Sequence, residues 1–132
     1  MNIEKGYFVV DGPTAEQIAT RCIGNGGRVF RLSGICCTKD EFFNAVRESL
    51  PLDPPLHSNQ SWDALADSLW SGLDTIPENS IAILWLTASQ LEKYAPDDFA
   101  IASTILKDLP ESLANPSLTV GPTKRLLVLR VN

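Results

Sequence analysis

Two nearly uninterrupted apolar runs restrict the fold of this 132-residue chain more than any other feature of its sequence. They are SIAILWLT at residues 80–87 and KRLLVLRV at residues 124–131. A strand with one face in water alternates apolar and polar residues, whereas a strand covered on both faces is apolar along its length. We therefore predict that both runs are buried strands with other elements packed on each side.

Helical patterns separate these strands from two shorter ones, GYFVV (6–10) and RVFRLSG (28–34). Apolar strands separated by helices pair in parallel through right-handed crossovers. The predicted fold class is therefore α/β, with a small, mainly parallel sheet of three to four strands packed with helices. A chain of this length forms about one domain, 1–132. Helices are predicted over 14–24, 89–95 and 96–109. Two further helices begin at cap motifs: one runs from the capping box at 38–41 to Leu50, and the other runs from the N-cap Ser61 to Leu73. Between these two helices, the prolines of residues 51–60 predict a stiff loop.

The net charge of −5 is distributed unevenly along the chain. Residues 40–111 contain thirteen acidic side chains against three basic ones, a balance of −10, and the two ends together carry +5. An acidic surface repels nucleic acid and attracts basic proteins, so we expect no direct binding to DNA or RNA. Acidic charge also keeps many proteins in solution, and the charge alone does not decide between these roles.

The sequence contains no feature that requires a membrane, a metal or a cofactor. No apolar run approaches the roughly 18 residues of a membrane span, and the N-terminus has no signal-peptide pattern, so we expect a cytoplasmic protein. Cys22, Cys36 and Cys37 have neither disulfide-framework nor zinc-site spacing and are predicted to be reduced. No phosphate-binding or nucleophile motif occurs. We expect no catalytic residues, no cofactor and a monomer when the protein is free.

The predicted helix that begins after Ser61 carries two aspartates four residues apart, Asp63 and Asp67. Residues at this spacing share a helix face, where like charges cost roughly 0.2–0.5 kcal/mol. Three explanations for the pair remain open: a solvated acidic face, a metal-binding or acid–base carboxylate pair, and a patch for a cationic partner. The apolar stripe of the same helix is predicted to be Trp62, Leu65, Leu69 and Leu73.

The segment SWDALADSLWSGL (61–73), followed by the strand IAILWLT (81–87), resembles the signature of the barstar family of intracellular ribonuclease inhibitors. The resemblance implies a barstar-like core over 26–132, preceded within the same domain by an additional strand and helix over 1–25. It also implies that the chain is not an enzyme. Its expected role is to inhibit a basic ribonuclease, as an immunity protein against a bacterial ribonuclease toxin domain.

The resemblance assigns partner-binding roles to the aspartate pair and to two residues near it. Asp63 and Asp67 match the two aspartates that enter the nuclease active site in this family. Ala66 stands where barstar has an interface tryptophan. His57 falls at a loop tyrosine that covers the nuclease site, and its alternative role is that of an ordinary loop histidine.

Asp108 and Trp70 complete the candidate partner-binding set. Asp108 matches a glutamate that forms a further salt bridge in the family. Trp70 is either an exposed interface anchor or partly buried beside the apolar stripe. The chain reads HSNQS at 57–61, where relatives often have aromatic-aromatic-Gly-x-Asn, so a toxin other than barnase is a possible partner. The two alternative functions are a non-inhibitory acidic interaction module and a metal-dependent enzyme that uses the aspartate pair.

Overall fold

The computed structural model describes residues 5–131 and contains one four-stranded sheet with the strand order β1-β4-β3-β2. All three strand pairs are parallel. Residues 1–4 of the predicted extension, and Asn132, lie outside the described residues. The elements are β1 (Gly6–Val10), α1 (Gly12–Gly24), β2 (Arg28–Leu32), α2 (Lys39–Ser49), α3 (Trp62–Thr75), β3 (Ser80–Trp85), α4 (Ala88–Tyr94), α5 (Pro96–Leu113) and β4 (Arg125–Val131).

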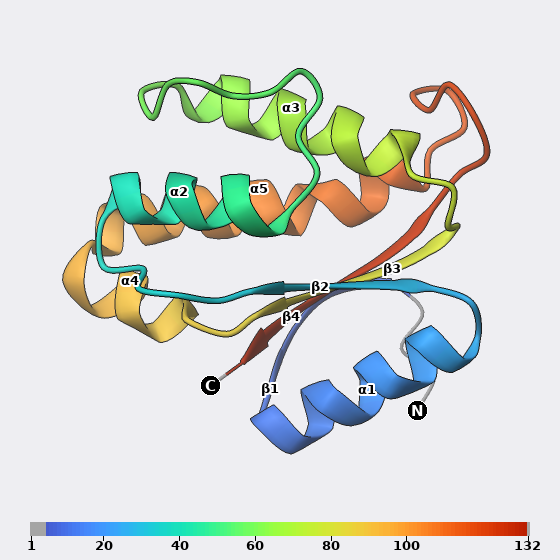
Figure 1. Ribbon diagram of the computed structural model, residues 1–132, viewed down its shortest axis with the longest axis horizontal. Helices are drawn as coiled ribbons and strands as arrows, with labels where there is room; N and C mark the ends of the chain where they lie inside the picture. The colour runs from blue at the N-terminus through green and yellow to red at the C-terminus, as the bar shows by residue number, and fades with distance from the viewer. Residues whose placement is uncertain (1–4, 132) are drawn as a thin grey trace.

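The helices lie on both faces of the sheet (Figure 1). Helix α1 covers one face, whereas α2, α3 and α5 lie together on the other. The chain crosses from β1 at one edge to β2 at the opposite edge and then steps back through β3 to β4. Crossovers between parallel strands share one hand, so this reversal of direction places α1 on the face opposite to the later helices.

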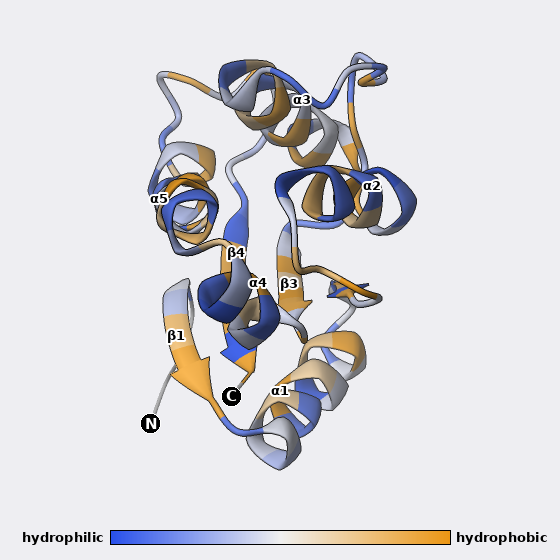
Figure 2. Cartoon of the chain, turned by 90° about the vertical axis from the view of Figure 1, so that its left-hand side faces the viewer, coloured by the Kyte–Doolittle hydropathy of each residue, from blue (hydrophilic) through white to orange (hydrophobic). Residues whose placement is uncertain are grey.

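Both faces of the central strands are buried, as the two apolar runs predict. On β3, Ile81, Ile83 and Trp85 pack into the larger core under α2, α3 and α5, and Ala82 and Leu84 pack into a smaller core under α1. Residues of β4 alternate between the two cores in the same way. In Figure 2 the apolar strand β3 accordingly lies between α1 and the pair α2 and α3.

The structure confirms the α/β fold class and gives the predicted order of strands and helices. Its largest correction to a boundary is at α5, which does not stop at residue 109 but continues through Pro110 to Leu113. Helix α1 begins two residues before its predicted start, α3 ends two residues after its predicted end, and β2 ends at Leu32 instead of residue 34. Pro110 is buried near the end of α5, where the missing N–H removes a single hydrogen bond from the last turn. Within residues 5–131 no helix combines the length and the apolar character that a bilayer span needs.

Candidate partner-binding groove between α3 and α5

The orientation of α3 is fixed at its N-terminus and along its apolar stripe. The Ser61 hydroxyl accepts a hydrogen bond of 3.1 Å from the Ala64 N–H, which confirms the predicted N-cap. Leu65, Leu69 and Leu73 are at most 1% exposed, so this face of the helix points into the larger core. Asp63 and Asp67 lie on another face and are exposed to solvent.

Both tryptophans of α3 are half-buried at the edge of the core. The ring centroid of Trp62 lies 5.0 Å from that of Phe43 and 5.7 Å from that of Phe42, which attaches the first turn of α3 to α2. Trp62 therefore packs against the core with the predicted apolar stripe, but it is only partly buried, unlike the three leucines. Trp70 is partly buried against the core, the second of the two placements that the sequence leaves open, and its exposed part lines the groove between α3 and α5.

A groove of about 600 Å³ lies between α3 and α5. It brings together five of the six candidate residues, which are separated by up to 45 positions in the sequence: Asp63, Ala66, Asp67, Trp70 and Asp108. Side chains of α5, including Ile101, Thr104 and Ile105, form the opposite wall. The groove thus has apolar walls and three carboxylates.

None of these three carboxylates has a cationic partner among residues 5–131. The ion pairs of the described chain join Arg28 to Glu78, Arg31 to Glu16 and Arg130 to Glu92. No side-chain hydrogen bond of the described residues satisfies Asp63, Asp67 or Asp108 either. The Nζ of Lys107, adjacent in sequence to Asp108, instead lies 5.1 Å from the ring centroid of Tyr7 on β1. The negative charge of the groove is therefore available to a partner.

The nearby cations of α2 are used to fix the loop 51–60. Arg47 donates hydrogen bonds to the Leu56 carbonyl at 2.7 Å and to Asn59 Oδ1 at 2.6 Å. Lys39 Nζ donates to the Gln60 carbonyl at 2.8 Å. These contacts hold the loop that leads into α3, and they leave His57 exposed on it, outside the groove lining. The structure therefore does not bring His57 together with the other candidates.

The middle of α3 also contacts this loop closely. The Asp53 N–H donates a hydrogen bond of 3.0 Å to the Ser68 carbonyl. Gly72 is buried against the chain at Pro51, and a Cβ atom at Gly72 would collide with the Pro51 carbonyl. A side chain at this position is excluded by the close approach of the loop, which fixes the distance between the loop and α3.

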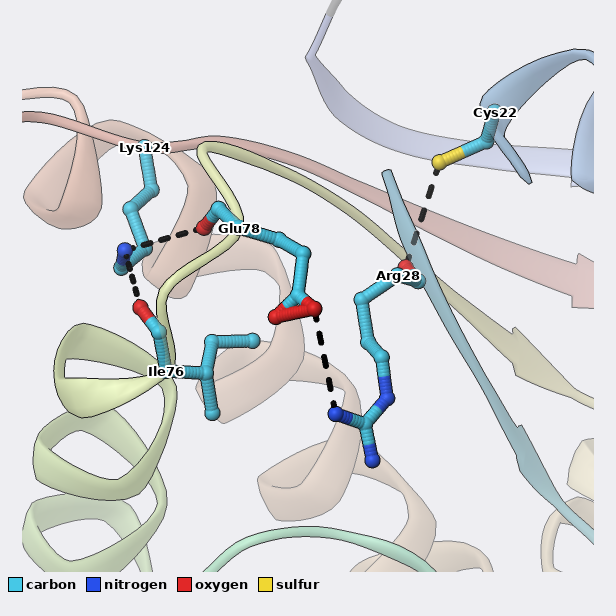
Figure 3. Close-up of polar contacts among 5 residues, drawn as sticks. All are labelled: Cys22, Arg28, Ile76, Glu78 and Lys124. Carbon is cyan, nitrogen blue, oxygen red and sulfur yellow. Dashed lines mark hydrogen bonds and ion pairs between the residues drawn. The ribbon is translucent and has the colours of Figure 1, made fainter. Parts of the chain in front are cut away.

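Lys124, the residue immediately before β4, connects the C-terminal ends of the two groove helices. Its Nζ donates hydrogen bonds to the carbonyls of Ile76, the C-cap of α3, and Glu78 (Figure 3). Its backbone N–H donates a hydrogen bond of 2.8 Å to the carbonyl of Leu113, the last residue of α5. A cation also suits the negative end of the α3 dipole. One residue thereby joins the C-terminal ends of the two helices that form the groove.

Sequence reasoning missed the apolar wall that α5 contributes. Ile105 stands three residues before Asp108 and Ile101 seven residues before it, spacings that place all three on one helix face. Ile101 is 41% exposed, so part of its side chain faces solvent at the groove. The sequence signal that could have predicted this wall is the presence of large apolar residues on the helix face that bears Asp108. Which helix faces α3 depends on the strand order, and the sequence does not specify that order.

The groove has no metal-ligand cluster. Across residues 5–131, histidine, cysteine, aspartate and glutamate side chains nowhere form a group of three that could hold a metal ion. The aspartate pair therefore has no third ligand of this type beside it. Cys22, Cys36 and Cys37 are all free thiols, and Cys36 is buried.

Comparison with protein families matches residues 28–121 to the family model described as Barstar (barnase inhibitor). The matched segment begins at β2 and includes both helices that form the groove. Searches of curated proteins and of solved structures gave no match.

Proposed function

Since the chain belongs to the barstar family, we propose that it inhibits a ribonuclease by placing the acidic groove of α3 and α5 in the nuclease active site. Proteins of this family are inhibitors and not enzymes. The observation that carries the proposal is the gathering of Asp63, Asp67 and Asp108 at one groove without a cation of the described chain beside them.

Charge complementarity explains how such a groove blocks RNA cleavage. A ribonuclease binds the phosphates of RNA with cationic side chains. Carboxylates held on a rigid helix occupy those cations in place of the phosphates, and the negative field of the inhibitor speeds the encounter. The substrate is excluded because both ligands need the same cations.

The proposed function also explains why two like charges lie on one face of α3. Asp63 and Asp67 repel each other on one face of α3 in the free protein. Cations of a nuclease relieve this repulsion, so the cost of the pair in the free state becomes a contribution to affinity. The fixed ends of α3 favour this use, because a rigid helix loses little conformational entropy on binding.

The proposal extends to the organisation and location of the protein. Strand β1 pairs with β4 over five residues, and α1 covers the second face of the sheet. These contacts support one domain in which residues 5–25 pack on the barstar-like core. We place the protein in the cytoplasm, as a monomer when free, where it meets a ribonuclease made in the same cell.

Inhibition of RNA cleavage tests the proposed function. The panel contains ribonucleases of the barnase type and toxin domains encoded beside genes for relatives of this chain. Wild type is expected to inhibit at least one of them, and Asp63→Ala/Asp67→Ala is expected to lose that inhibition. The control Glu48→Ala/Asp97→Ala removes the same charge from exposed positions outside the groove and is expected to keep it. Equal inhibition by both double variants would refute the proposed site.

If no enzyme of the panel is inhibited, an acidic interaction module becomes the better description. The basic partner would then be identified by pull-down with the wild-type protein, with the Asp63→Ala/Asp67→Ala variant as the reference.

A further inference from the structure

The groove between α3 and α5 contains space that the described chain does not fill. Ala66 and Trp70 are one turn apart on α3, and Ile101 and Ile105 are one turn apart on α5. Ala66 contributes a single methyl group to this lining, so the space beside it between α3 and α5 stays open. The 41% exposure of Ile101 agrees with such an opening.

The size and polarity of the groove restrict what can occupy it. A volume of about 600 Å³ is larger than one side chain and lies in the range of sites that hold a small ligand or a short peptide segment. Apolar walls favour a large apolar side chain, because burial removes its surface and that of the isoleucines from water. The negative charge of Asp63, Asp67 and Asp108 favours cations beside that side chain.

We propose that the groove receives a short segment of the partner in which a large apolar side chain is flanked by arginine or lysine. This inference rests on the proposed function, and it adds the chemical class of the segment that is recognised. The apolar side chain lies between Ala66 and the isoleucines of α5, and the flanking cations pair with the carboxylates. Charge alone steers many basic proteins to the groove, whereas the apolar side chain selects among them.

The small side chain of Ala66 is the feature that determines this specificity. The substitution Ala66→Phe would fill the space that the partner's apolar side chain occupies in this proposal, and it leaves all three carboxylates in place. The variant Ala66→Phe therefore separates the apolar contribution from the electrostatic one. Gln17→Phe, on the exposed face of α1, is the matched control because it adds the same ring away from the groove.

A peptide titration followed by NMR tests the inference without knowledge of the nuclease. The probes are three capped peptides of equal length with the central sequences Arg-Phe-Arg, Arg-Ser-Arg and Ser-Phe-Ser. The Arg-Phe-Arg peptide is expected to shift the signals of the Trp70 indole N–H and of the Ile101 and Ile105 methyl groups. Its binding should exceed that of either other peptide by about tenfold.

Peptide binding by the two phenylalanine variants then shows whether the apolar side chain enters the groove beside Ala66. Ala66→Phe is expected to weaken binding of the Arg-Phe-Arg peptide to the level of Arg-Ser-Arg, and Gln17→Phe is expected to leave it unchanged. The inference is overturned if Arg-Phe-Arg and Arg-Ser-Arg bind equally, if no saturable shift occurs, or if Ala66→Phe binds as wild type does. It is also overturned if the same signals shift on concentration without peptide, because a second copy of the chain would then occupy the groove.

The ribonuclease assay distinguishes failure of this inference from failure of the proposed function. One possible outcome is that wild type and Ala66→Phe inhibit a ribonuclease equally and Asp63→Ala/Asp67→Ala does not. This outcome would support the inhibitor function and contradict the recognition of an apolar side chain. Selective peptide binding without inhibition of any ribonuclease would support the segment and count against the inhibitor function.

Discussion

The Nζ of Lys124 lies 2.7 Å from the carbonyl oxygen of Ile76, to which it donates a hydrogen bond at the C-terminal end of α3. Lys124 is 3% exposed, and the same ammonium group also donates to the Glu78 carbonyl at 3.0 Å. A buried lysine that donates to backbone carbonyls connects β4 to the end of the groove helix. The position of α3 therefore depends on a residue that follows the segment matched to the family.

Lys124→Met is expected to lower the free energy of unfolding by about 1–3 kcal/mol, because it removes the hydrogen bonds that the buried Lys124 donates to the carbonyls of Ile76 and Glu78. Urea unfolding measures this change. Lys93→Met, at an exposed position of α4, is the control and is expected to stay within about 0.5 kcal/mol of wild type. Equal stability of the two variants would mean that Lys124 does not hold the end of α3.

Gly72→Ala is expected to destabilise the protein by about 1–3 kcal/mol, since the new methyl group collides with the Pro51 carbonyl. Gly24→Ala is the matched control because a Cβ at Gly24, the last residue of α1, meets nothing within 4 Å. Thermal unfolding compares the two variants. A wild-type melting temperature for Gly72→Ala would contradict the close approach of the loop to α3.

Leu69→Ala is expected to cost about 2–5 kcal/mol of stability, because Leu69 is 1% exposed in the core under α3. Asp67→Ala, two positions earlier on an exposed face, is expected to change stability by at most about 0.5 kcal/mol. Chemical denaturation of both variants gives the comparison. If Leu69→Ala were as stable as wild type, the assigned orientation of α3 would be wrong.

Burial raises the pKa of the Cys36 thiol from its usual 9.0 to about 11. The folded state therefore favours the neutral thiol more than the unfolded state does. The resulting stabilisation is complete below pH 9 and is lost as the pH rises from 9 to about 11. Unfolding free energies measured across this pH range should fall less steeply for Cys36→Ala than for wild type. Parallel pH profiles would contradict the assigned burial of the thiol.

The sequence predicts the elements of the fold well because their signals are local. The runs at 80–87 and 124–131 lack the alternation of a half-exposed strand, and both central strands are indeed buried on two faces. The Ser61 N-cap depends on residues within one turn and is confirmed by its hydrogen bond. The end of α5 is misplaced because tertiary packing continues the helix through Pro110.

The groove is less predictable because it depends on contacts between distant segments. Asp63 and Asp67 are visible as an unfavourable pair in the sequence, and the family resemblance adds Asp108. The contribution of Ile101 and the half-buried state of Trp62 follow from how α5 and α2 pack beside α3. That arrangement is set by the strand order β1-β4-β3-β2, for which the sequence carries no local signal.

The dissociation constant of the complex between Asp67→Ala and an inhibited ribonuclease tests the central claim most directly. Truncating one partner of a buried charge pair costs about 2–5 kcal/mol, which corresponds to a dissociation constant raised by about 30-fold to several thousand-fold. We predict a loss in this range, with the stability of the free protein unchanged. A dissociation constant equal to that of wild type would contradict the claim that the α3 carboxylates occupy the nuclease active site.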